Sequence, residues 1–186
     1  MIREAPDLRA AIREAAYLEG DFVLRSGRRS RYYLDKYRFE SRPEILGPLG
    51  RLIAALVDQV EPEAVRLAGP ELGAVALVAS ASLASGKPFV IVRTAAKAYG
   101  TSNRLEGAYA ENETVCLVED VVTSGGAAVA AVEALREAGL RCSAAVCVVD
   151  REEGGVDALA RSAVRLHPLF RVSDIVGAKP PENPHG

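Results

Sequence analysis

Residues 115–139, VCLVEDVVTSGGAAVAAVEALREAG, decide the fold. The stretch begins with the continuous apolar residues of a buried strand and ends as an alanine-rich helix that closes at Gly139. Between these parts lie two adjacent carboxylates, Glu119 and Asp120, and the small loop TSGGA at 123–127. We therefore predict a strand–loop–helix unit that carries charged chemistry at the carboxyl end of its strand.

The TSGGA loop has the composition of a phosphate site. In open α/β sheets, ligands bind at the carboxyl ends of the strands. The backbone N–H groups of such a turn and the N-terminus of the following helix attract anions. Thr123 and Ser124 add hydroxyl donors, and Gly125 and Gly126 let the backbone approach a ligand closely. No lysine follows the glycines, which excludes the Walker P-loop.

The two carboxylates beside this loop indicate a second part of the ligand. Carboxylates bind hydroxyl groups or a hydrated Mg²⁺, and a phosphate with neighbouring hydroxyls is a sugar phosphate. The alternative is that Glu119 and Asp120 only cap the next helix. We disfavour it because one aspartate would suffice and caps prefer Ser, Thr, Asp or Asn to Glu.

The rest of the chain alternates apolar strands with helices. We expect strands at 64–69, 88–93, 113–120, 141–151 and 164–170, and helices at 6–18, 43–58, 72–85, 125–139 and 155–162. Continuous apolar strands that alternate with helices predict an α/β fold with a parallel sheet covered on both faces. Pro48 should kink or delay its helix.

Two segments depart from this alternation. Phe22 and Leu24, then Tyr33 and Tyr37, suggest two short strands joined by a turn at 26–27. Residues 94–112 are long and polar, and a loop of that length in a compact domain is usually functional, often as a lid.

The 186 residues fit one domain, 1–186, which we divide into an N-terminal segment of about 1–40, a core at 41–175 and a loose tail at 176–186. The formal net charge of −2 argues against a general nucleic-acid footprint. No apolar run is long enough to span a membrane. The charged N-terminal stretch lacks the apolar region of a secretory signal, so we expect a cytoplasmic protein without membrane or nucleic-acid partners.

The three cysteines, Cys116, Cys142 and Cys147, lie in apolar contexts and are expected to be reduced, buried thiols. With only His167 and His185 as histidines, a transition-metal site made by protein ligands is not expected.

Four segments together resemble the orotate phosphoribosyltransferases, which are type I phosphoribosyltransferases. VCLVEDVVTSGGA resembles the motif that binds phosphoribosyl diphosphate (PRPP), and FVLRSGRRSRYYLD (22–35) resembles the N-terminal signature of that family. VRTAAKAYGTSNRLEG (92–107) resembles its lid, and VVDREEGG (148–155) resembles its D-R-x-E-G-G segment. The resemblance spans about residues 18–170. It implies a central parallel sheet flanked by helices, a small N-terminal hood and a flexible lid loop.

The resemblance also implies an activity. Members transfer the phosphoribosyl group of PRPP to orotate, which gives orotidine 5′-monophosphate and pyrophosphate in the synthesis of the pyrimidine nucleotide UMP. Mg²⁺ is the implied cofactor, bound mainly through PRPP and not by protein side chains. A homodimer is implied as well, in which each lid reaches into the site of the neighbouring subunit.

Site residues carry over by their positions in these motifs. The PRPP site would consist of Arg93, Lys97, Tyr99, Glu119, Asp120, Val121, Val122, Thr123, Ser124, Gly125, Gly126 and Ala127, with Arg93, Lys97 and Asp120 as its catalytic members. The orotate site would consist of Arg25, Tyr33, Leu34, Thr123 and Arg151. An arginine suits orotate because its planar fork binds a carboxylate through two parallel hydrogen bonds.

Each charged assignment has a simpler alternative. Arg151 could form a surface ion pair with Glu152 or Glu153, which would contribute little. Arg93 and Lys97 could be part of a solvated face, the usual fate of such residues, although this leaves the length of the lid unexplained.

The sequence also departs from the family pattern. Thr94 and Leu72 stand at or near positions where many members carry a basic residue, so two of the usual cations are missing. Tyr99 stands where many members have histidine, and it can donate a hydrogen bond but no charge. Tyr33 and Leu34 could equally be core residues. Two alternative functions stay open: transfer to another nucleobase, and a regulator that senses PRPP without turnover.

Overall fold

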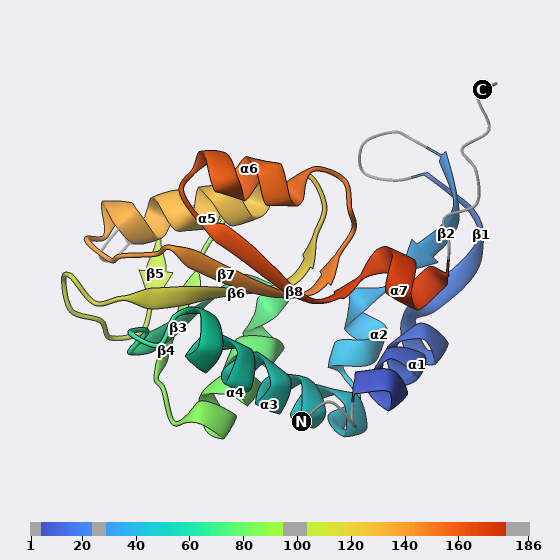
Figure 1. Ribbon diagram of the computed structural model, residues 1–186, viewed down its shortest axis with the longest axis horizontal. Coiled ribbons are helices and arrows are strands. Elements are labelled where there is room, and N and C mark those ends of the chain that lie inside the picture. The colour runs from blue at the N-terminus through green and yellow to red at the C-terminus, as the bar shows by residue number, and fades with distance from the viewer. Residues whose placement is uncertain (1–4, 24–28, 95–103, 178–186) are drawn as a thin grey trace.

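The computed structural model describes residues 5–23, 29–94 and 104–177, and its centre is a six-stranded sheet in the order β5-β4-β3-β6-β7-β8 (Figure 1). The strands are β3 (Arg66–Pro70), β4 (Phe89–Val92), β5 (Leu105–Glu106), β6 (Val115–Val122), β7 (Ala144–Asp150) and β8 (Arg165–Arg171). All neighbours pair in parallel except β4 and β5. The predicted parallel sheet is confirmed. The antiparallel edge strand β5 is a correction, because it lies inside the segment that we expected to be a polar loop.

Helices cover both faces of this sheet. The helices α3 (Pro43–Val60) and α4 (Ala74–Ser85) lie on one face, and α5 (Gly126–Glu137) and α6 (Gly155–Arg161) lie on the other (Figure 1). Side chains of β6 alternate between the two cores: Val115 and Leu117 pack with residues of α5, whereas Cys116 and Val118 pack with residues of α3 and α4. A strand buried on both faces needs apolar residues at every position, which explains its continuous apolar sequence.

Helix α3 starts at Pro43 and passes through Pro48, so the expected delay is wrong. Proline at the first helical position costs nothing, because that N–H has no helical partner anyway. Beyond it, the helix buries Ile45, Leu49 and Ile53, which recur every four residues on one face. Burial of this face offsets the backbone hydrogen bond that Pro48 cannot donate.

The N-terminal residues form a smaller layer at one end of the molecule (Figure 1). It contains α1 (Ala5–Ala16), the antiparallel pair β1 (Tyr17–Val23) and β2 (Arg29–Leu34), and the short helix α2 (Lys36–Glu40). Tyr37 therefore lies in a helix and not in a strand, which corrects our expectation. The backbone N–H of Asp35 donates to the Ala16 carbonyl at 2.9 Å and fixes the start of α2 against the end of α1.

A final helix, α7 (Val172–Val176), follows β8 and buries Val172 and Ile175 in the core that also contains residues of α1. This helix was not predicted, because five residues are too few to show a helical period.

The strand order reverses beside β3. The chain proceeds from β3 to its neighbour β4, and after β5 it returns to the other side of β3 to form β6. Loops that leave β3 and β6 at their carboxyl ends therefore diverge, and the gap between such ends is where α/β sheets bind ligands. The sequence at this point contains Glu119 and Asp120.

Two further observations concern composition. Cys116, Cys142 and Cys147 are buried and free, as predicted, and burial raises the pKa of Cys142 to about 11. Within the described ranges, no helix is long and apolar enough to cross a membrane.

Candidate active site

A pocket opens at the reversal point between the carboxyl ends of β3 and β6. Most of the predicted PRPP residues line it: Glu119, Asp120, Val121, Val122, Thr123, Gly125 and Ala127. Residues from elsewhere complete it, namely Lys36 of α2, Glu71 and Gly73 after β3, and Thr94 after β4. One continuous stretch thus supplies half the wall, and segments far apart in the sequence supply the other half.

The carboxylates of Glu119 and Asp120 are directed to opposite sides of β6, since neighbouring residues of a strand alternate. Asp120, 3% exposed, follows Cys116 and Val118 toward the side of α4, where it accepts an ion pair from the Lys36 ammonium. Glu119 comes two residues after Leu117 and therefore lies on the same side of β6 as Leu117. Burial, and then the charge of Asp120, raises the pKa of Glu119 to about 8.

The TSGGA loop has the shape of an anion site. Gly125 has a φ of 84°, a left-handed conformation that glycine adopts without strain. The first helical hydrogen bond of α5 runs from the Val129 N–H to the Gly125 carbonyl at 2.9 Å. The N–H groups before it have no helical partner and can bind an anion.

The start of α6 supports this loop from behind. A β-carbon on Gly155 would lie 2.8 Å from the Thr123 carbonyl oxygen and would overlap the Val122 side chain. The second glycine of the EEGG segment is therefore a packing requirement of the phosphate loop.

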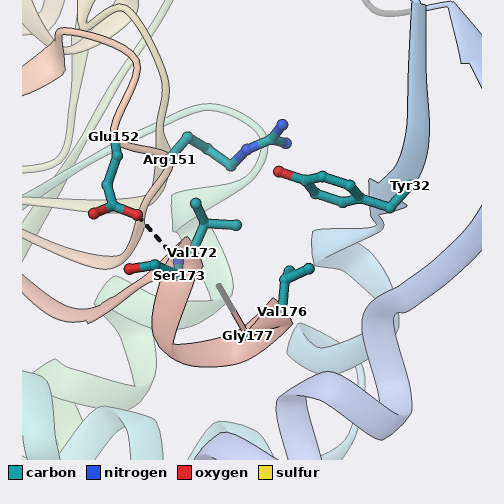
Figure 2. A pocket seen from close by; sticks show the side chains of 7 residues that line it. All are labelled: Tyr32, Arg151, Glu152, Val172, Ser173, Val176 and Gly177. Atoms are coloured by element: carbon teal, nitrogen blue, oxygen red, sulfur yellow. Dashed lines mark hydrogen bonds between the residues drawn. The ribbon is translucent and has the colours of Figure 1, made fainter. Parts of the chain in front are cut away.

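A second pocket lies beside the first, around Arg151 and Tyr32 (Figure 2). Figure 2 shows the Arg151 guanidinium directed toward the Tyr32 ring. The Arg151 Cζ lies 5.4 Å from the centroid of that ring. Arg151 is 8% exposed, and its Nε has no hydrogen-bond partner in the described part of the chain. The N–H of Arg151 donates to the Val122 carbonyl at 2.8 Å, which joins this pocket to the end of β6.

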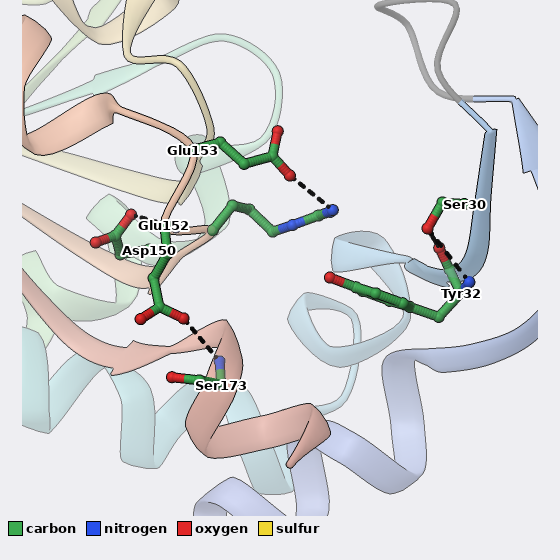
Figure 3. Close-up of polar contacts among 7 residues, drawn as sticks. Ser30, Tyr32, Asp150, Glu152, Glu153 and Ser173 are labelled. Atoms are coloured by element: carbon green, nitrogen blue, oxygen red, sulfur yellow. Dashed lines mark hydrogen bonds and ion pairs between the residues drawn. The ribbon is translucent and has the colours of Figure 1, made fainter. Parts of the chain in front are cut away.

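Polar contacts hold both walls of this second pocket (Figure 3). The Glu152 N–H donates to Asp150 at 2.9 Å, and the Ser173 N–H of α7 donates to Glu152 at 3.1 Å. Across the pocket, the Ser30 hydroxyl donates to the Tyr32 carbonyl at 2.7 Å. Arg151 itself donates to Glu153 at 3.1 Å. The expected alternative of an ion pair with a neighbouring glutamate is thus present, but the arginine is buried.

The tyrosine that faces Arg151 is not the one that the sequence motif predicts. Tyr33 is directed to the other side of β2, where it contacts Phe22 with ring centroids 5.6 Å apart. Leu34 is 5% exposed and belongs to the core. Side chains alternate along β2, so Tyr32 and Leu34 lie on the same side of the strand, which faces inward. This alternation is the sequence signal that identifies Tyr32.

Arg93 directly follows β4 and does not line the pocket, although Glu71 and Thr94 beside it do. Its Nη1 lies 3.6 Å from a Glu106 oxygen and 4.0 Å from a Glu71 oxygen. The neighbouring Thr94 donates its N–H to Glu71 at 2.9 Å and lines the pocket. Leu72, the other position without its usual cation, is 71% exposed.

Three further predicted residues, Arg25, Lys97 and Tyr99, lie outside the described residues. Lys36, in contrast, was not predicted and lines the PRPP pocket. No local sequence pattern marks Lys36, because its partner Asp120 lies 84 positions away.

Known proteins support the same interpretation. Residues 38–165 match the model of the phosphoribosyl transferase domain. The orotate phosphoribosyltransferase of Methanocella arvoryzae is 49% identical over 162 residues, which cover 87% of this chain and 90% of that protein. This chain belongs to the orotate phosphoribosyltransferase family.

Solved structures of the orotate phosphoribosyltransferase family have the same architecture. The Mycobacterium tuberculosis enzyme in complex with Fe(III) dicitrate has a TM-score of 0.82 and 28% identity, with 92% of this chain and 98% of that chain covered. The same enzyme in complex with PRPP has a TM-score of 0.79 and 25% identity, with 93% and 99% covered. The fold is the type I phosphoribosyltransferase fold, as the sequence motifs predicted.

Proposed function

We propose that this chain transfers the 5-phosphoribosyl group of PRPP to orotate and releases pyrophosphate, which forms orotidine 5′-monophosphate in pyrimidine (UMP) biosynthesis. The observation that carries the proposal is the buried Arg151. Its guanidinium lines a pocket of its own, and its backbone is bonded to the strand that bears Glu119 and Asp120. Its Nε is a buried donor without a hydrogen-bond partner among the described residues, and such a donor is costly unless a ligand binds it.

In this proposal the first pocket binds PRPP. The carboxyl groups of Glu119 and Asp120 bind the ribose hydroxyls, since carboxyl oxygens accept hydrogen bonds from hydroxyl groups. The N–H groups of residues 123–127 and the positive end of α5 bind the 5′-phosphate. The complex of the Mycobacterium tuberculosis relative with PRPP supports this ligand.

The second pocket binds orotate. The Arg151 fork pairs with the orotate carboxylate, and the exchange of Glu153 for this ligand leaves the guanidinium charge balanced. The Tyr32 ring lies where it can stack on the flat pyrimidine. We assign this role to Tyr32 in place of Tyr33, because Tyr32 lines the pocket with Arg151.

The transfer needs stabilisation of the leaving group. The bond from the anomeric carbon to pyrophosphate breaks with its electron pair on the pyrophosphate oxygen, and a ring nitrogen of orotate bonds to the same carbon and releases its proton. Negative charge grows on pyrophosphate, so fixed cations near it lower the barrier. Arg93, whose Nη1 lies 4.0 Å from an oxygen of the pocket residue Glu71, and Lys97 of the lid are our candidates, the latter on the family resemblance alone.

Mg²⁺ fits the donor set of the first pocket. Within the described residues, no group of three or more His, Cys, Asp or Glu side chains could hold a metal ion. Mg²⁺ would therefore bind mainly through the phosphates of PRPP and through water, and the carboxyl groups of Glu119 and Asp120 in the pocket wall would contact only its water ligands. When bound, it would neutralise charge on pyrophosphate.

We further propose a cytoplasmic homodimer in which each lid serves the site of its neighbour. The free thiols of the three cysteines fit a reducing compartment. Mixed dimers of inactive Lys97→Ala and Asp120→Asn chains should recover part of the activity, because one site in each dimer would have both residues. Verified mixed dimers without recovery would contradict the shared site.

Loss of orotate absorbance with PRPP and Mg²⁺ tests the function directly. We expect the chain to consume orotate and not uracil, hypoxanthine or adenine, because only orotate carries a carboxylate for Arg151. Consumption of a neutral base would favour the other phosphoribosyltransferases. Tight PRPP binding with no depletion of any base would favour the sensing regulator.

A further inference from the structure

The PRPP pocket has a cation that no family motif assigns. The usual basic positions hold Thr94 and Leu72, and the residue after Leu72 is Gly73, which has no side chain. A β-carbon built on Gly73 would overlap both the Asp120 carboxylate and the Lys36 ammonium. The Lys36 ammonium, which comes from α2, therefore occupies the space next to the β3 loop that a side chain at position 73 would take.

Lys36 is charged and is partly accessible from the pocket. Its side chain is 32% exposed, whereas the Asp120 carboxylate with which it pairs is 4% exposed. Burial lowers the pKa of Lys36, but the hydrogen bond and the charge of Asp120 outweigh this effect and raise it. Lys36 also lines the pocket together with Glu71 and Thr94, beyond the carboxylate. A ligand that enters the pocket meets this ammonium.

A second acidic residue, Glu40, lies near Lys36 on α2. Glu40 lies one helical turn further along α2 and is 5% exposed, and its Oε1 has no hydrogen-bond partner in the described part of the chain. Burial, and then the charge of Asp120, raises the pKa of Glu40 to about 8. The ammonium of Lys36 nevertheless pairs directly with the carboxylate of Asp120, so Asp120 is the anion that holds Lys36 in the free protein.

We propose that Lys36 binds the pyrophosphate group of PRPP and supplies one of the positive charges that this chain lacks at positions 72 and 94. In the free protein its ammonium pairs with Asp120. When the ribose hydroxyls of PRPP bind Asp120, the ammonium turns to the pyrophosphate oxygens on the side of Gly73. Lys36 keeps its proton throughout and stabilises the leaving group as a cation. This inference rests on the proposed function.

The reverse reaction separates this role from a structural one, because pyrophosphate and orotidine 5′-monophosphate are then added independently. In Lys36→Met we expect the KM for pyrophosphate to rise by about tenfold or more, the typical loss for a hydrogen bond to a charged group. The KM for orotidine 5′-monophosphate should stay within about twofold. Lys36→Gln, which can still donate to Asp120 but carries no charge, should behave like Lys36→Met.

Two further variants serve as controls. Lys36→Arg keeps the charge and should recover most of the pyrophosphate affinity. Lys87→Met removes a lysine that pairs with Asp58 at 3.2 Å, away from the pocket, and should leave both KM values unchanged. Thermal unfolding of each variant checks that the chain is folded.

The following results would decide against the inference. Unchanged pyrophosphate KM in Lys36→Met and Lys36→Gln would overturn it, and so would an equal rise of both KM values, which indicates that Lys36 only orders the pocket. A wild-type chain without turnover in either direction would overturn the proposed function, and the role of Lys36 would fail with it. Wild-type turnover with unaltered variants would overturn the role of Lys36 alone.

Discussion

The two pockets of this molecule are built in different ways. The PRPP pocket takes half its wall from one continuous stretch, the end of β6 and the loop before α5. The pocket around Arg151 combines Tyr32 of β2, the residues after β7 and helix α7, which are far apart in the sequence. The first pocket is a local motif that can be recognised from spacing, whereas the second exists only once the N-terminal layer and the C-terminal helix are placed on the sheet.

One backbone hydrogen bond connects the two constructions. The Arg151 N–H donates to the Val122 carbonyl at 2.8 Å, so the residue expected to bind orotate starts beside the residues expected to bind PRPP. Among the described residues, however, the two pockets share no lining residue, so we expect changes to the local motif to act on its own backbone and changes to the assembled pocket to act on orotate alone. The following predictions test that division.

Within the local motif, substitution of Gly125 should lower the stability of the chain most. Gly125→Ala forces a residue with a β-carbon into a φ of 84° and sets that atom 3.0 Å from the Ala158 methyl. We expect the free energy of unfolding to fall by about 1–2 kcal/mol. Urea denaturation measures it.

Gly126→Ala is the matched control for stability. A β-carbon there meets nothing within 4 Å, and the position lies in α5. The substitution should leave the free energy of unfolding unchanged or raise it slightly, since alanine is the better helix former. Equal losses in the two variants would show that backbone conformation is not what Gly125 provides.

The assembled pocket should depend on Tyr32. Tyr32→Leu removes an aromatic face beside Arg151, and we expect the KM for orotate to rise by roughly three- to tenfold while the KM for PRPP is preserved. Tyr33→Leu is the comparison, because Tyr33 is directed to the opposite side of β2. Steady-state kinetics of both variants measures the KM for orotate. A larger rise in Tyr33→Leu than in Tyr32→Leu would indicate that Tyr33 is the residue that contacts orotate.

The smallest effect concerns Glu40, a buried carboxyl at the end of α2. Burial raises its pKa from 4.5 to about 8, so between these values the folded chain binds a proton that the unfolded chain does not. The stability that this carboxyl contributes is complete below pH 4.5 and is lost as pH rises through 8. Glu40→Gln should therefore flatten the decline in stability across that window.

Urea denaturation at several pH values measures this slope. Glu119, whose pKa is raised to about 8 in the same way, should keep part of the decline in the variant. A slope identical to that of the wild type would show that Glu40 does not titrate in the folded chain as we expect.

The sequence was sufficient where structure is local. The apolar run into Glu119, the TSGGA loop and the alanine-rich helix predicted residues that line half of the pocket between β3 and β6, and the alternation of elements predicted the parallel sheet. Tyr32 was missed because the motif names the pair after it, and only the packing of Leu34 into the core shows which side of β2 faces inward.

Other features were not predictable for a related reason. Helices α2 and α7 have five residues each, and β5 has two, which is too short for any periodicity. Lys36 contacts a residue 84 positions away, and no local pattern marks such a contact. Tertiary placement, and not propensity, determines all of these features.

The central claim is that Arg151 makes this chain specific for an acidic pyrimidine, and Arg151→Ala tests it most directly. We expect kcat/KM for orotate to fall by about 100- to 1,000-fold, the loss of two charge-assisted hydrogen bonds, with the KM for PRPP within about threefold of wild type. Arg165→Ala, a change of an exposed arginine in β8, should leave both unchanged. Orotate turnover that survives Arg151→Ala would contradict the account.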